Sequence, residues 1–280
     1  MIRVELAKLF RRPRTYITAL LLCALPFIVA VFLATTPIPP PPGQGGAFLS
    51  AVLGNGALYP AAAMALVMPV FLPVSVAVLA GDAVAGEASA GTLRYLLIRP
   101  VGRTRLLVAK LVALVVFVLF AIGMVVATSY LTGITLFGSQ PAAAPPGQIA
   151  LPADVTSLSG STISPTGLGL RLLGTVAYIV VSMLGVAAIA LFLSTLTDSA
   201  LGAAMGSLAV LVTSQVLVTL DAAAAVRPYL PTRYWLAWID FFREPILWRD
   251  IERGAALQLV YLAVLLGAAW ANFMTRDVTS

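Results

Sequence analysis

Six apolar stretches, each long enough to cross a lipid bilayer, constrain this 280-residue chain more than any other feature. A helix needs about 20 apolar residues to cross the hydrocarbon core of a bilayer. Only Lys110 and Arg171, both near the ends of a stretch, bring charge into them. The stretches cover residues 15–36, 57–80, 106–129, 170–195, 200–220 and 255–273. We therefore predict an all-α integral membrane protein, with residues 1–280 forming a single transmembrane domain built as a six-helix bundle.

Composition agrees with a surface that faces lipid. Charged residues make up 10% of the chain and hydrophobic residues 60%, whereas soluble globular proteins carry about 25% charged residues. The chain has no histidine and a single cysteine, Cys23, which we interpret as a small packing residue. Disulfides within the chain, the usual zinc ligand sets and Ser-His or Cys-His catalytic pairs are thereby excluded.

The basic residues predict the orientation in the membrane. Residues 1–14 and 81–105 are rich in Lys and Arg, while 37–56 and 130–169 contain neither. Loops that carry Lys and Arg remain in the cytoplasm, so both termini are expected there. Residues 221–254 fall outside by this count although they hold five Arg and five acidic residues. The basic clusters lie beside apolar runs, which favours contact with lipid headgroups over binding of nucleic acid.

Residues 1–14 have the pattern of an amphipathic helix that ends at Pro13. Its apolar residues recur at spacings of three and four, and its basic residues lie on the other side. The apolar set is Ile2, Leu6, Leu9 and Phe10, and the basic set is Lys8, Arg11 and Arg12. We expect a surface helix that rests on the inner leaflet; the alternative is a basic flank that only fixes orientation.

Residues 81–113 form a cytoplasmic elbow with an unusual composition. The segment carries two acids, Asp82 and Glu87, and then a short predicted helix that starts at Thr92 and ends before Pro100. Leu93, Leu96 and Leu97 lie on one side of that helix. An exposed apolar ridge favours either a docking surface for a partner or an interfacial helix that faces lipid. The residues alone leave both open.

The stretch from Gly86 through Lys110, GEASAGTLRYLLIRPVGRTRLLVAK, resembles the first cytoplasmic loop of type 2 ABC-transporter permeases. These are the membrane subunits of bacterial drug, antibiotic and polysaccharide exporters. The resemblance extends to the surface helix, to the small-residue turn at 191–206 and to the six-span layout. It thus involves essentially the whole chain, although only the loop pattern is moderately specific.

The resemblance implies a role for the elbow. In that family the loop is a coupling helix that docks on an ATP-binding subunit, and its Glu contributes to the contact. The implied coupling residues are Glu87, Thr92, Leu93, Arg94, Leu96, Leu97 and Arg99. The chain has no G-x4-GK[ST] phosphate loop, so ATP and Mg²⁺ are expected on two copies of a separate subunit. The chain itself is expected to be no enzyme and to bind no metal or cofactor.

Two further groups are candidates for the transport path. Residues 228–248 hold Trp235, Trp238, Phe241 and Phe242, which form either an aromatic belt at the outer interface or, as the family implies, an external gate. The most polar intramembrane group, Thr213, Ser214 and Gln215, is a candidate for contact with cargo. Prolines at 60, 69 and 73 are expected to kink the second span.

These features together predict the permease subunit of an ATP-driven exporter in a bacterial plasma membrane. It would pair with a second copy or a sister permease and pass a hydrophobic or amphipathic cargo. Only two of the 17 basic residues are Lys, and this preference for Arg is typical of a GC-rich bacterial genome. Two alternatives remain: a membrane-embedded enzyme that acts on lipid, which would need paired acids or bases, and a structural membrane subunit with no transport role.

Overall fold

A computed structural model describes residues 1–36, 55–91, 102–138 and 155–275. Within them the chain is almost entirely helical, and six helices are long and apolar enough to cross a membrane. These are α2 (Pro13–Thr35), α5 (Phe71–Ser89), α7 (Arg103–Leu136), α8 (Pro165–Leu196), α9 (Ala200–Thr219) and α10 (Trp248–Thr275). The prediction of an all-α, multi-pass membrane protein is confirmed at this level.

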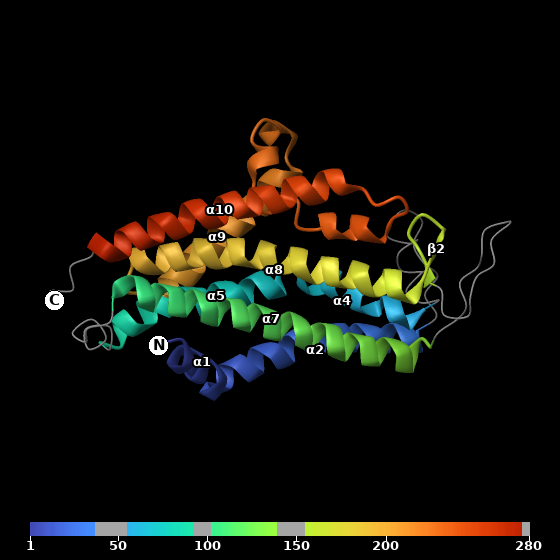
Figure 1. The fold of residues 1–280 in the computed structure, drawn as a ribbon, viewed down its shortest axis with the longest axis horizontal. Helices are drawn as coiled ribbons and strands as arrows, with labels where there is room; N and C mark the ends of the chain where they lie inside the picture. Colours follow the sequence, from blue (N-terminus) through green and yellow to red (C-terminus); the bar gives the residue numbers. More distant parts are fainter. Residues whose placement is uncertain (37–54, 92–101, 139–154, 276–280) are drawn as a thin grey trace.

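The helices lie side by side along the long axis of the molecule, and the start of α1 and the end of α10 are at the same end (Figure 1). The central element is α8, which packs against α5, α7, α9 and α10. On the other side of the bundle, α7 also packs against α2 and α4 (Tyr59–Val67). The core therefore lies along α8 and α5, and α2 covers one flank.

Several spans are longer than the sequence predicted. Helix α7 has 34 residues, about 50 Å at the usual rise per residue, against a hydrocarbon core of about 30 Å. Its polar first turn and its Thr- and Gly-containing last turns lie outside the purely apolar stretch 106–129. A count of apolar residues finds the part that crosses lipid, and it misses the turns that continue beyond the membrane surface.

The second predicted span, 57–80, is not one helix. It begins as a short 3₁₀ turn η1 (Gly56–Leu58) and α4, breaks at residues 68–70, and resumes as α5. Pro69 lacks an N–H, and in a continuous helix its ring would clash with the carbonyl of the residue four positions earlier, while Pro73 fits the first turn of the new helix. The expected kink is thus a full break. Helix α5 then runs to Ser89, so residues 86–89 belong to its last turn and not to a separate docking helix.

The N-terminal helix α1 (Ile2–Arg11) is present and ends before Pro13, as predicted. Its contact face differs from the expected apolar one. Leu9 is buried, whereas Ile2 is 44% exposed, and the side chains of Glu5 and Lys8 face the bundle beside Leu9. Phe10 also packs edge-on against Phe120 of α7, at 5.5 Å between ring centroids. Helix α1 is therefore fastened to the bundle by charge as well as by apolar contact.

An irregular segment joins α9 to α10. It consists of short 3₁₀ turns, η2 (Asp221–Ala223), η3 (Arg227–Tyr229) and η4 (Ala237–Phe242). Part of it projects sideways from the bundle beside α10 (Figure 1). A two-stranded hairpin, β1 (Val155–Thr156) with β2 (Thr162–Ile163), covers η4: the Leu158 N–H donates to the carbonyl of Phe242, at 2.9 Å.

Candidate functional site

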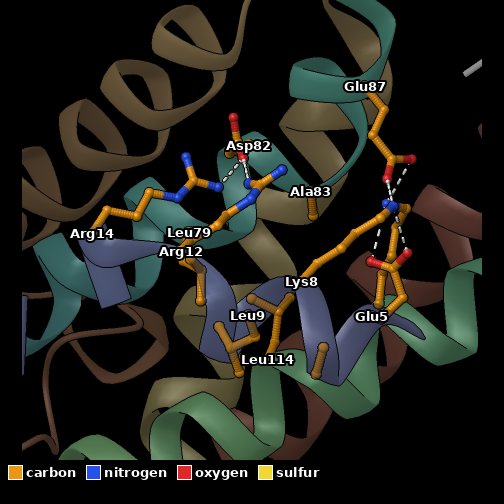
Figure 2. A pocket seen from close by; sticks show the side chains of 12 residues that line it. Glu5, Lys8, Leu9, Arg12, Arg14, Leu79, Asp82, Ala83, Glu87 and Leu114 are labelled. Carbon is orange, nitrogen blue, oxygen red and sulfur yellow. Dashed lines mark hydrogen bonds and ion pairs between the residues drawn. The ribbon is translucent and has the colours of Figure 1, made fainter. Parts of the chain in front are cut away.

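Charged side chains from four helices meet where α1, α2, α5 and α7 come together (Figure 2). Two lysines and two glutamates form its first half. The Lys8 Nζ lies 3.0 Å from Glu5 Oε1 and 2.8 Å from Glu87 Oε1. The Lys110 Nζ lies 2.8 Å from Glu87 Oε2 and 3.7 Å from Glu5 Oε2. We call these four residues the lysine–glutamate box; it joins α1 to α5 and α7.

Within the lysine–glutamate box, Glu87 and Lys110 are shielded from solvent, whereas Lys8 is partly exposed. Glu87 is 8% exposed and Lys110 is 3% exposed. Lys110 lies near the end of an apolar stretch, where an amine usually extends toward the membrane surface. Here the amine turns inward, because two carboxylates face it. Burial alone lowers the pKa of Lys8, but the hydrogen bonds and charges of Glu87 and Glu5 outweigh it and raise that pKa above the ordinary value. Lys8 is therefore charged at neutral pH.

The second half of the site holds two arginines on one carboxylate. The guanidinium groups of Arg12 and Arg14 both donate to Asp82 Oδ2, that of Arg12 at 2.9 Å. Gly86, one turn further along α5, leaves room for this carboxylate: a Cβ on Gly86 would lie 2.2 Å from Asp82 Oδ1. We call this group the arginine pair. It fastens the corner between α1 and α2 to α5.

A small cavity of about 60 Å³ lies between the two halves. A volume of this size holds water or a small polar group. Among the described residues, no three His, Cys, Asp or Glu side chains are grouped so as to hold a metal ion. The lining residues are Glu5, Lys8, Leu9, Arg12, Arg14, Leu79, Asp82, Ala83, Glu87, Lys110, Ala113 and Leu114.

The position of Glu87 differs from the one that the coupling interpretation gave it. Its carboxylate was expected to meet a basic group on a partner, yet both of its oxygens bind lysines of the same chain. The other predicted coupling residues lie outside the described ranges. These are Thr92, Leu93, Arg94, Leu96, Leu97 and Arg99.

The first turn of α7 is fastened to the last turn of α10. The Arg103 guanidinium donates to the carbonyl of Phe273 at 3.1 Å and to that of Met274 at 2.8 Å. The indole N–H of Trp270 donates to the Thr104 hydroxyl at 3.0 Å. Arg103 belongs to the basic segment 81–105, for which contact with lipid headgroups was expected. Its guanidinium here caps the carbonyls that a helix leaves unpaired at its C-terminus.

Sequence reasoning missed a buried serine on α8. The Ser194 hydroxyl accepts from the backbone N–H groups of Val84 and Ala85, at 3.1 and 2.9 Å, and donates to the carbonyl of Gly81 at 2.7 Å. It thereby binds α8 to the backbone of α5 close to Asp82. A serine in an apolar run gives no signal of such a contact, because its partners lie more than a hundred positions away.

At the opposite end of the bundle, the aromatic segment lies inside the protein. All four predicted gate residues are buried: Trp235, Trp238, Phe241 and Phe242. The Trp238 indole N–H lies 3.2 Å from the sulfur of Met68, at the break between α4 and α5. In a simple aromatic belt these rings would face lipid and would be exposed, as the ring of Trp248 is at 53%. The four rings therefore act as packing within the bundle in this conformation.

Polar side chains of the spans hold this irregular segment in place. The Ser214 and Thr232 hydroxyls lie 2.7 Å apart, the Gln258 amide donates to the carbonyl of Pro231 at 2.6 Å, and the Tyr178 hydroxyl donates to that of Tyr234 at 2.5 Å. Non-helical backbone at membrane depth needs such partners.

The three residues proposed to touch cargo do not form one surface. Ser214 is 3% exposed and bonded to Thr232, Thr213 is exposed, and Gln215 is partly buried. The structure brings Ser214 to the irregular segment, and it leaves Thr213 on the outer side of α9. A shared polar wall from these positions is absent.

A second, wider cavity lies between α8, η4 and α10. It has a volume of about 540 Å³ and is lined mostly by apolar groups, including Leu170, Gly174, Phe241 and Trp248. Arg171 is at its rim, paired with Glu244. An apolar cavity with one charged rim suits an apolar or amphipathic molecule.

Comparison with known proteins gives a family but no activity. The family model for a protein of unknown function, DUF2705, matches residues 27–279, which is all of the chain except its first helix, the first half of α2 and the final residue. No curated protein matches the sequence. Since the match covers nearly the whole chain, including five of the six long helices in full, this protein belongs to the DUF2705 family.

Proposed function

We propose that this protein is the permease subunit of an ATP-driven exporter, working with a second permease and two separate ATP-binding subunits. The observation that carries the proposal is the set of ion pairs between the helices on either side of residues 92–101. Glu87, near the end of α5, binds both Lys110, near the start of α7, and Lys8 of α1. A partner that moved the loop would move three helices together.

Helix α5 offers a mechanical link between the two ends of the molecule. It carries Glu87 and Asp82 in its later turns, and it starts three residues after Met68, whose sulfur contacts the Trp238 indole. A shift of α5 along its axis would change the packing of the aromatic segment. In this proposal ATP-driven movement at the charged site opens the exit at the buried aromatic rings.

The proposed cargo is hydrophobic or amphipathic. The wide cavity beside α8 and α10 supports this choice, because apolar groups make up most of its wall. Ion-coupled transport would instead need ionisable groups along the path, and the charged side chains described above are gathered near the ends of the spans.

The test is purification of the full chain from its native membranes in mild detergent. We expect a protein with a G-x4-GK[ST] phosphate loop to co-purify in equal amount and to bring ATPase activity. Leu96→Asp, on the proposed docking ridge, should remove both while expression is unchanged. Ala7→Asp is the matched control, because it adds the same charge at an exposed position of α1. Co-purification that Leu96→Asp leaves intact would refute the docking role, and ATPase activity in the chain alone would refute the division of labour.

A further inference from the structure

The charges of the two halves of the site differ in balance. In the lysine–glutamate box two ammonium groups face two carboxylates, so the charges cancel. In the arginine pair two guanidinium groups share one carboxylate oxygen, so two positive charges against one negative leave a surplus of one. A further anion would complete the second half and would find no place in the first.

The arginine pair also has hydrogen-bond donors to spare. A guanidinium carries several N–H groups in a planar fork, and Asp82 Oδ2 accepts only one from each arginine. The Arg14 Nε is buried without an acceptor among the described residues. The side chains of Arg12 and Arg14 are 45% and 40% exposed, and that of Asp82 is 22% exposed. The exposed parts of the two guanidinium groups, unlike the buried Arg14 Nε, are thus reachable from outside, while the carboxylate is largely covered.

The surroundings indicate which anion could reach these donors. Arg12 lies between α1 and α2, and Arg14 is the second residue of α2, the first helix able to cross the membrane. The next turns of α2 expose apolar side chains: Tyr16 is 52%, Ile17 56% and Leu20 68% exposed. The arginine pair therefore lies directly beside an exposed apolar surface that suits acyl chains.

We propose that Arg12 and Arg14 bind the phosphate of an anionic phospholipid from the leaflet at this end of the bundle. The planar fork of arginine suits phosphate oxygens, and Asp82 holds the two guanidinium groups side by side. Asp82 also competes with the phosphate, and so limits its affinity. The inference needs only that this end meets a membrane surface, and it is independent of the exporter proposal.

The experiment measures thermal unfolding of the purified full chain in a neutral detergent at low salt, where charge contacts are least screened. Phosphatidylglycerol or phosphatidylcholine with the same acyl chains is added at equal amounts. Anionic lipid should raise the unfolding temperature more than neutral lipid, by roughly 2–4 °C for one added contact in a chain of this size.

A pair of double variants separates the proposed site from general charge attraction. Arg12→Gln/Arg14→Gln should lose the difference between the two lipids. Arg3→Gln/Arg11→Gln is the matched control, since it removes the same charge from two exposed positions of α1. This control should keep the difference between the two lipids. No preference in the wild type, or equal loss in both variants, would overturn the proposal.

Asp82→Asn gives a second test that does not depend on the arginine variants folding. If the arginines only serve as an ion pair, this variant should be destabilised equally in both lipids. If they bind phosphate, anionic lipid should restore its stability and the preference should exceed that of the wild type. An unchanged preference would count against the proposal. Inorganic phosphate is added in a parallel arm: an equal gain without lipid would show a free-phosphate site and contradict the lipid assignment.

Discussion

Lys110 shows how far a single charged side chain can depart from what its neighbours in sequence suggest. It lies in an apolar stretch two turns into α7, and its amine is held by Glu87 at 2.8 Å inside the bundle. The sequence predicts that Lys110 lies near a helix end, where an amine usually extends to the membrane surface. Its partners Glu5 and Glu87 come from other helices, and no local pattern connects them. The two lysines and two glutamates could thus be found as charges but not as a cluster.

Removal of Lys110 should be costly for the same reason. In Lys110→Met, the buried carboxylate of Glu87 loses its buried cationic partner, and breaking one side of a buried pair costs about 3–5 kcal/mol. Lys8→Met should cost less, because the Lys8 side chain is 37% exposed and solvent already screens it. Thermal unfolding in detergent measures both. The double variant Lys110→Met/Glu87→Gln should recover part of the loss, and equal losses in the two single variants would show that burial does not set the cost.

Among the elements, the broken second span was partly foreseeable. Pro69 and Pro73 predict a disturbed helix, but whether it bends or separates depends on what supports the ends. Here Trp238 from a distant segment packs at Met68, and η1 begins the span with a separate turn. The irregular segment between α9 and α10 was foreseen only as an aromatic cluster. Its burial depends on Tyr178 and Gln258, which look like ordinary members of apolar helices, and on Ser214, which the sequence indicated as a candidate for contact with cargo.

The contact between η1 and α7 can be tested with two glycines of the same helix. A Cβ on Gly133 would lie 2.2 Å from the carbonyl oxygen of Gly56, and backbone cannot yield to it cheaply. A Cβ on Gly123 would meet nothing within 4 Å. We expect Gly133→Ala to lower the unfolding temperature clearly. Gly123→Ala should leave it unchanged or raise it, because alanine favours a helix over glycine by about 1 kcal/mol. A similar response of both variants would mean that the close approach is not maintained in the folded protein.

At the scale of the whole molecule, six long helices bring the start of α1 and the end of α10 to one end, together with the charged site (Figure 1). An even number of crossings requires this, whichever side of the membrane that end faces. The side is predicted by charge alone: residues 37–56 and 130–169 carry no Lys or Arg, while 1–14 and 81–105 carry many. The positive-inside rule then assigns the charged end to the cytoplasm, where an ATP-binding partner would have to be.

Reporter fusions test this assignment directly. Reporters fused after residues 14, 102 and 280 should show cytoplasmic locations, and a reporter fused at residue 44 should show an external location. A further fusion after residue 138, where α7 has ended, should agree with the one at 44, because the basic first turn of α7 and its far end must lie on opposite sides.

Neutralising Arg11, Arg12 and Arg14 together should weaken the bias toward a cytoplasmic N-terminus without changing the number of crossings. An external C-terminus with a cytoplasmic N-terminus would overturn the six-span count, and external positions for both termini would place the charged site away from any cytoplasmic source of ATP.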